Sequence, residues 1–181
     1  MGRYVNVAIG QLGPVNKVDS RAAVVARLMN LMREAHQLGA DLIVYPELAL
    51  TTFFPRWYIE DEAQLDAWCE TAMPGSETLP LFELARTLQV GFCLGYAELS
   101  REQGEKKRFN TSILVDKSGE IVGKYHKVHL PGHREHEPGA RSSIWKSAIS
   151  RPAVNFRCLT PLTVGSAWRS ATIVAGAKPI A

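Results

Sequence analysis

The order of strand-like and helix-like segments constrains the fold of this chain most. Residues 4–11 alternate and carry β-branched residues, and residues 41–46 are a short, mainly apolar run; both patterns are typical of strands. Between them, apolar residues recur at helical spacing, with Ser20 as the N-cap and Gly39 as the stop. The pattern then predicts helices over 61–71 and 79–89, a strand over 90–99, and a hairpin of 108–116 with 120–125. This order predicts an α/β fold with a mixed sheet.

The composition changes sharply after residue 138. All 18 Asp and Glu residues precede it, whereas residues 139–181 hold six of the 21 Lys and Arg residues and no acid. That segment is rich in Ala and Ser and has no clean period. We therefore expect residues 1–138 to form one domain and residues 139–181 to be a poorly ordered tail.

The basic residues of the tail are scattered singly, without the clusters or aromatic spacing typical of nucleic-acid binding. No segment is long and apolar enough to span a membrane, and the N-terminus lacks the pattern of a signal peptide. We therefore expect a cytoplasmic protein that binds neither nucleic acid nor membrane. Three widely spaced cysteines favour reduced thiols over disulfides or a zinc site.

Two charged residues follow predicted strands, where α/β sheets place functional groups. Glu47 follows the strand 41–46, and its carboxylate is suited to a general base or to capping a backbone amide. Lys127 follows the strand 120–125, and its charge is suited to stabilising an oxyanion. From position alone, a structural role for either residue remains open.

The other reactive side chains are less well placed. His126, His129 and His133 invite a metal site, but no carboxylate or cysteine at ligand spacing supports one. A cysteine would be the natural nucleophile beside Glu47 and Lys127. However, Cys69 and Cys93 fit packing roles, and Cys158 lacks the strand end and turn that would expose a thiolate.

The segments "YPELALTTFFPRW" and "RFNTSILVDKSGEIVGKYHKVHLPGH" resemble the carbon–nitrogen hydrolase (nitrilase) superfamily. Within it, "TTFFPRW" and "RFNTSILVDKSG" resemble the N-carbamoyl-D-amino acid amidohydrolases, the D-carbamoylases. The resemblance covers about residues 4–138. It implies the N-terminal portion of a four-layer α-β-β-α sandwich, usually assembled as a homo-oligomer.

The resemblance also implies a reaction without metal or organic cofactor. Glu47 would be the general base, Lys127 the oxyanion-stabilising cation, and His129 a residue of the substrate pocket. The small-molecule substrate would be an N-carbamoyl-D-amino acid, hydrolysed to the D-amino acid, ammonia and carbon dioxide. The family's nucleophile lies in a motif like "ICNDRRWPETYR", which is missing here, so we expect this chain to be inactive.

A shift of the reading frame by one base can account for the missing motif. Codons for "SATIVAGAKPIA" (170–181), read from one base upstream, permit that motif at every position but one. The same shift applied to "SSIWKSAIS" (142–150) permits a segment of the kind that carbamoylases carry. The hypothesis is therefore that residues 139–181 are translated out of frame. As an alternative, the chain is a non-catalytic remnant or a subunit that joins an intact carbamoylase.

Overall fold

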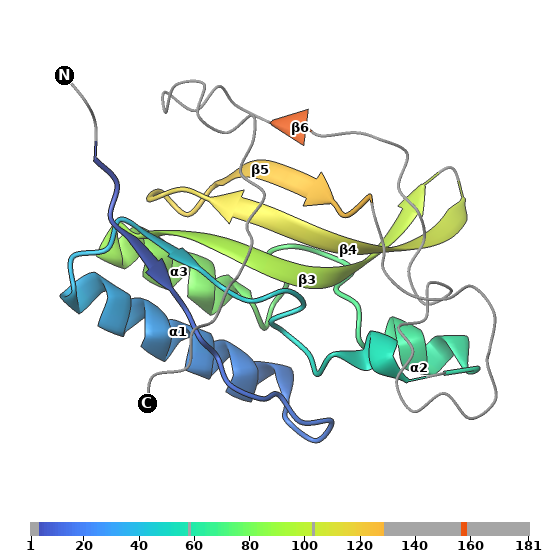
Figure 1. Ribbon diagram of the computed structural model, residues 1–181. Coiled ribbons are helices and arrows are strands. Elements are labelled where there is room, and N and C mark those ends of the chain that lie inside the picture. Colours follow the sequence, from blue (N-terminus) through green and yellow to red (C-terminus); the bar gives the residue numbers. More distant parts are fainter. Residues whose placement is uncertain (1–3, 58, 103, 129–156, 159–181) are drawn as a thin grey trace.

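The computed structural model describes residues 4–57, 59–102, 104–128 and 157–158. Their strands form one sheet in chain order, with neighbouring strands side by side (Figure 1). β1 to β3 pair in parallel and the later strands pair antiparallel, so the predicted mixed sheet is confirmed. The strands are β1 (Val7–Ile9), β2 (Leu42–Val44), β3 (Gly91–Glu102), β4 (Glu105–Val115), β5 (Ile121–His126) and the two-residue β6 (Arg157–Cys158).

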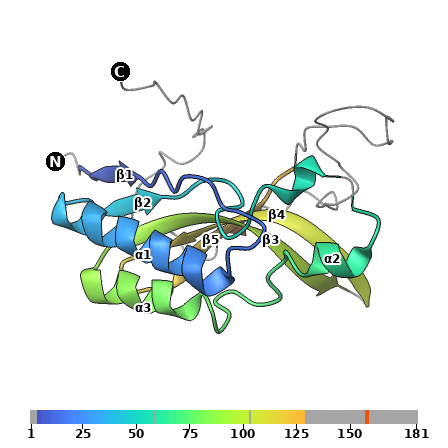
Figure 2. The same cartoon turned by 90° about the horizontal axis from the view of Figure 1, so that it is seen from below.

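Two helices cover one face of the sheet, α1 (Arg21–Gln37) and α3 (Leu79–Leu88) (Figure 2). The Ser20 hydroxyl caps α1 by accepting a hydrogen bond from the Ala23 N–H, and Gly39 follows it with a φ of 79°, as the sequence predicts. The apolar stripe of α1 and that of α3 pack against Phe92 and its neighbours in a continuous core. Of the four layers expected, the described residues form two, one helical and one sheet.

The helix predicted over 61–71 is shorter, and that expectation is wrong beyond residue 66. α2 (Glu62–Asp66) begins after the N-cap Asp61 and follows the short 3-10 helix η1 (Phe54–Arg56). The chain then leaves the helix because Glu70 donates its N–H to the Ala97 carbonyl at 2.8 Å and accepts from the Leu99 N–H at 2.9 Å. Pairing with the sheet therefore competes successfully with continued helix.

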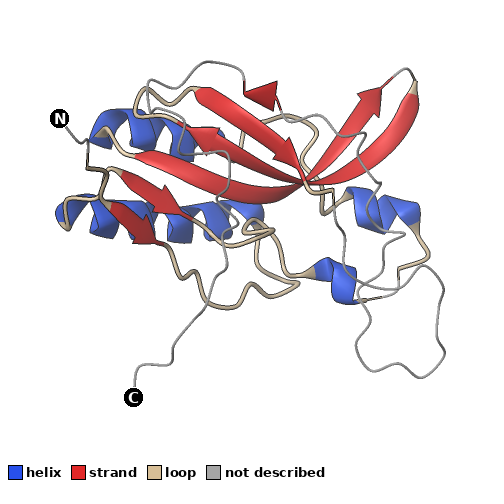
Figure 3. Cartoon of the chain, turned by 45° about the horizontal axis from the view of Figure 1, so that its top comes forward, coloured by secondary structure: helices blue, strands red, loops and turns tan. Residues whose placement is uncertain are grey.

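The hairpin of β3 and β4 is the longest pairing in the sheet, and it reaches beyond the other strands (Figure 3). Both strands extend further than predicted, because the charged residues between 100 and 108 still pair across the hairpin. The second hairpin, β4 with β5, is confirmed. In its turn, Asp116 Oδ1 accepts hydrogen bonds from the Ser118 and Glu120 N–H groups, and Gly119 has a φ of 82°.

The edge strand β1 exposes apolar side chains on the face opposite the helices. Val7 is 52% exposed and Ile9 76%, whereas Ala8 between them contacts the core. Within the described ranges, no helix has the length and apolarity to cross a membrane. The predicted poor order of residues 139–181 concerns a segment of which only the pair 157–158 is described.

Candidate active site

Glu47 lies in the turn that follows β2. This turn packs on β3, on the face opposite α1 and α3. The turn is close to the strand: a Cβ added at Gly95 would lie 3.0 Å from Glu47 Cα and 3.0 Å from the Pro46 oxygen. The Ala49 N–H donates to the Gly95 carbonyl at 2.8 Å. Leu48 holds a φ of 50°, a left-handed conformation that a leucine adopts only under packing constraint, and its side chain is buried. The backbone therefore fixes Glu47 tightly.

One oxygen of Glu47 binds two donors. Oε1 accepts a hydrogen bond from Lys127 Nζ at 2.6 Å and from Asn110 Nδ2 at 2.6 Å. Oε2 accepts no hydrogen bond from any residue in the described part of the chain. The Glu47 side chain is 46% exposed and that of Lys127 30%. A carboxylate with one anchored oxygen and one accessible oxygen can accept a proton, and the ammonium beside it can stabilise a developing negative charge.

Asn110 is a functional candidate that the sequence prediction missed. It is buried on β4, and its main-chain carbonyl accepts the Lys127 N–H at 2.8 Å while its side chain binds Glu47. One residue thus holds both members of the pair. The available signal was a single amide directly after Phe109 in the predicted strand "RFNTSILV", since buried polar groups need partners.

A second carboxylate, Glu98, lies on the opposite face of the same strands. Its Oε2 accepts from Thr111 Oγ1 at 2.8 Å and from His126 Nε2 at 2.9 Å, and its Oε1 accepts from Lys124 Nζ at 2.5 Å. Burial by itself raises the pKa of Glu98, but the hydrogen bonds from His126, Lys124 and Thr111 together outweigh it. They lower the pKa to about 2. Glu98 is therefore ionised at neutral pH.

The histidines do not form a metal cluster within the described residues. His126 stacks on Phe109 with ring centroids 4.1 Å apart and binds Glu98, on the face away from Glu47. His129, predicted to line the substrate pocket, and His133 both lie outside the described residues. Elsewhere in the described part, no three His, Cys, Asp or Glu side chains gather in a way suited to a metal ion.

The two cysteines with described side chains lack the environment of a nucleophile. Burial raises the pKa of the Cys69 thiol to about 12, and Sγ donates to the Leu65 carbonyl at 3.4 Å. Burial also raises the pKa of Cys93, which lies inside β3 as predicted. The backbone of Cys158 pairs with Gly123, four residues before Lys127, which is about 13 Å along a strand. The raised pKa values of Cys69 and Cys93 both oppose thiolate formation.

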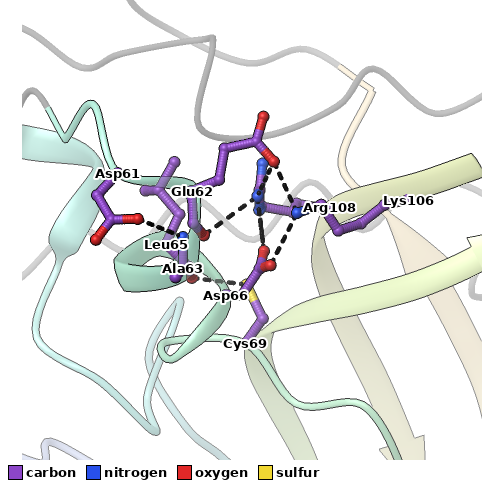
Figure 4. A network of polar contacts seen from close by, with 8 residues as sticks. All are labelled: Asp61, Glu62, Ala63, Leu65, Asp66, Cys69, Lys106 and Arg108. Atoms are coloured by element: carbon purple, nitrogen blue, oxygen red, sulfur yellow. Dashed lines mark hydrogen bonds and ion pairs between the residues drawn. The ribbon is translucent and has the colours of Figure 1, made fainter.

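A network of ion pairs connects α2 to the N-terminal end of β4 (Figure 4). Asp66 accepts from Arg108 Nε at 2.7 Å and from Lys106 Nζ at 2.9 Å, and Glu62 binds both cations as well. Arg108 lies two residues before Asn110, so both side chains belong to the Glu47 face. The network thereby connects the segment that follows Glu47 to the strand that holds its partner.

Comparison with known proteins identifies the family. The model of the family described as carbon-nitrogen hydrolase matches residues 6–167, which extends beyond residue 138, where the resemblance was expected to end. The out-of-frame origin of residues 139–181 stays a prediction. A nitrilase from Meyerozyma guilliermondii is 28% identical over 177 residues, which cover 93% of this chain and 52% of that protein. The chain thus spans about half the length of that relative.

Solved structures share the fold. A carbon-nitrogen hydrolase from Helicobacter pylori aligns with a TM-score of 0.61 and 19% identity, over 84% of this chain and 46% of that one. An amidase from Nesterenkonia sp., solved with acrylamide added to its active site cysteine, aligns with a TM-score of 0.60 and 18% identity. That alignment covers 83% of this chain and 51% of the amidase. With most of its length matched by the family model, this chain belongs to the carbon-nitrogen hydrolase family.

Proposed function

We propose that this chain carries the proton-transfer and oxyanion groups of a D-carbamoylase. The intact enzyme would convert an N-carbamoyl-D-amino acid and water to the D-amino acid, ammonia and carbon dioxide. The observation that carries the proposal is the anchoring of Glu47: Asn110 and Lys127 hold Oε1, while none of the described residues donates to Oε2, which can exchange a proton. The substrate class rests on the segments "TTFFPRW" and "RFNTSILVDKSG", which resemble the carbamoylases.

The geometry suits a cysteine-dependent acyl transfer. Glu47 Oε2 takes the proton of the thiol, and the thiolate attacks the carbamoyl carbon while the carbonyl electrons move onto oxygen beside Lys127. Collapse of the intermediate breaks the bond between the carbamoyl carbon and its terminal nitrogen. That nitrogen takes the proton from Glu47 and leaves as ammonia. Glu47 then deprotonates water, which displaces the sulfur. The resulting carbamic acid breaks down to carbon dioxide and the amino acid.

This chain is proposed to lack turnover, because neither Cys69 nor Cys93 is activated and the family's cysteine motif is missing. Carboxylate and ammonium cannot substitute for the bond-forming thiolate. We therefore expect no ammonia release from N-carbamoyl-D-phenylalanine by this chain. Turnover that is abolished by Cys158→Ala would overturn this expectation.

The decisive experiment is to sequence the gene across codons 130–181 and to express the protein with the frame restored. We expect a one-base shift near codons 138–141 to open a longer frame containing the cysteine motif. The restored enzyme should hydrolyse N-carbamoyl-D-phenylalanine and spare the L-enantiomer. Activity on simple amides or nitriles, without any on carbamoyl substrates, would keep the family and refute the carbamoylase assignment.

A second candidate function, an interaction subunit, is favoured by the exposed apolar residues of β1. Val7 and Ile9 project from an edge strand, and such edges promote pairing with another chain. We expect the chain to self-associate or to join an intact carbamoylase, as analytical ultracentrifugation would reveal. Substituting Ile9→Lys should weaken this association, whereas Val18→Lys, at an exposed apolar residue outside the strands, should leave it unchanged.

A further inference from the structure

The strands β4 and β5 carry two carboxylate sites on their opposite faces. Asn110 and Lys127 bind Glu47, whereas the residues next to them in sequence, Thr111 and His126, bind Glu98. Neighbouring residues of a strand point to opposite faces, so the same two strands present both sets. The end of β5 is therefore held from both sides at adjacent residues.

Glu98 holds β5 at two points one pleat apart. Lys124 and His126 project from β5 to the same face, and both donate to this carboxylate. Thr111, the residue on β4 that lies directly opposite His126, donates to the same oxygen as the imidazole. Because Glu98 is ionised, His126 Nε2 must carry the proton of that hydrogen bond.

Lys127 follows immediately after His126, the last residue of β5. Among the described residues, its main-chain N–H donates to the Asn110 carbonyl at 2.8 Å. The direction in which its ammonium leaves the strand therefore depends on where His126 is fixed. A long side chain on a fraying strand end samples many rotamers, which weakens any pairing it makes.

We propose that Glu98 is a positioning residue that fixes the end of β5 through His126 and Thr111, so that Lys127 meets Glu47 on the other face. That Glu98 matters for catalysis rests on the proposed function. That Glu98 fixes the position of Lys127 does not depend on it. In the described part of the chain, Glu98 accepts hydrogen bonds from Thr111, Lys124 and His126, so its effect on Lys127 is transmitted through the strand.

The test on the chain itself is brief acetylation followed by mass spectrometry of each lysine. In Glu98→Gln we expect Lys127 to be labelled about fivefold faster, the factor for losing a partly exposed ion pair. Lys106, held by Asp66 and Glu62, should be labelled as in the parent. The matched control is Glu83→Gln, at an exposed position on α3, which should leave Lys127 unchanged. Unchanged Lys127 labelling in Glu98→Gln would overturn the proposal.

If Glu98→Gln unfolds the chain, labelling of Lys106 rises as well, and two substitutions of His126 decide instead. His126→Phe keeps a ring against Phe109 but removes the donor, whereas His126→Gln keeps an amide donor and loses the ring. We expect faster Lys127 labelling in His126→Phe and labelling close to the parent in His126→Gln. Equal labelling of Lys127 in the two variants would refute the proposal.

The frame-restored enzyme gives a second, catalytic readout. Glu98→Gln should lower kcat with little change in KM, because the ammonium acts on the reacting oxygen rather than on substrate binding. If the restored parent shows no carbamoylase activity, the proposed function fails, yet the labelling result still decides the role of Glu98. If the parent is active and the variant matches it in kcat, the role assigned to Glu98 is wrong.

Discussion

The Glu47 site and the Glu98 site are built on the same strands but have different roles. Glu98 is 14% exposed and has both oxygens engaged, by Thr111, Lys124 and His126. Glu47 is 46% exposed and engages only Oε1 among the described residues. A partly buried carboxylate with both oxygens bonded gives stability and a fixed charge, whereas a carboxylate with one bonded oxygen keeps the other for proton transfer. The difference lies in the number of donors, since the residue type is the same.

The largest expected effect comes from removing the charge at Glu47. In the frame-restored enzyme, Glu47→Gln should lower kcat by about a thousandfold, because an amide cannot accept the thiol proton. The amide oxygen can still accept from Lys127 and Asn110, so folding should be preserved. Steady-state kinetics and a thermal melt measure the two effects. Glu83→Gln is the matched control, and a kcat for Glu47→Gln within twofold of the parent would remove Glu47 from the mechanism.

Acid should remove the stabilisation that Glu98 provides. Its pKa is near 2 in the folded chain against 4.5 as the ordinary value, so its stabilisation is present above about pH 4.5 and is lost as the pH falls toward 2. The loss amounts to about 3 kcal/mol at most. Other carboxyls with lowered pKa values also lose stabilisation in acid: Asp41, Glu62, Asp66 and Asp116.

Comparison of the parent with Glu98→Gln therefore isolates the contribution of Glu98. Urea unfolding should show a large difference in the free energy of unfolding at pH 7 and a small one at pH 2.5. A difference that stays constant across this range would mean that the carboxylate of Glu98 is not specially stabilised.

An added methyl group at Gly95 should disturb the Glu47 face alone. The Cβ of Gly95→Ala would press on backbone atoms of residues 46–48, which cannot rotate away, so we expect a loss of about 1–3 kcal/mol in unfolding free energy. Gly123→Ala is the matched control on β5, because its Cβ would make only an ordinary 3.6 Å contact with Leu114. Equal destabilisation by the two substitutions would show that the turn of Glu47 is not tightly seated.

The smallest effect is expected at the α2 network, whose ion pairs include neither Glu47 nor Glu98. Asp66→Asn should cost about 1 kcal/mol, and less in high salt, because the ion pairs are partly exposed. Glu105→Gln, at a looser 3.9 Å pair with Lys107, should change the unfolding free energy by much less. A cost for Asp66→Asn that does not fall with salt would point to packing rather than charge.

The sequence predicted the element order and named Glu47 and Lys127 as candidate catalytic residues, since strand ends and a family resemblance both mark those positions. The hydrogen bond between the two side chains came from the structure. The sequence could not predict Asn110 or Glu98 as partners, because their roles arise from register. Glu98 meets His126 only through the alignment of β3 with β4 and of β4 with β5. The shortness of α2 has a similar cause, a distant pairing of Glu70 with β3 that no local pattern records.

The register of β5 also limits how this gene can change. Deleting one residue between Gly123 and His126 would turn every following side chain to the other face. An imidazole and an ammonium would then exchange carboxylates, and both sites would fail together. Single-codon insertions and deletions should therefore be tolerated in the turn at 117–119, whereas within the strand they should disrupt both carboxylate sites.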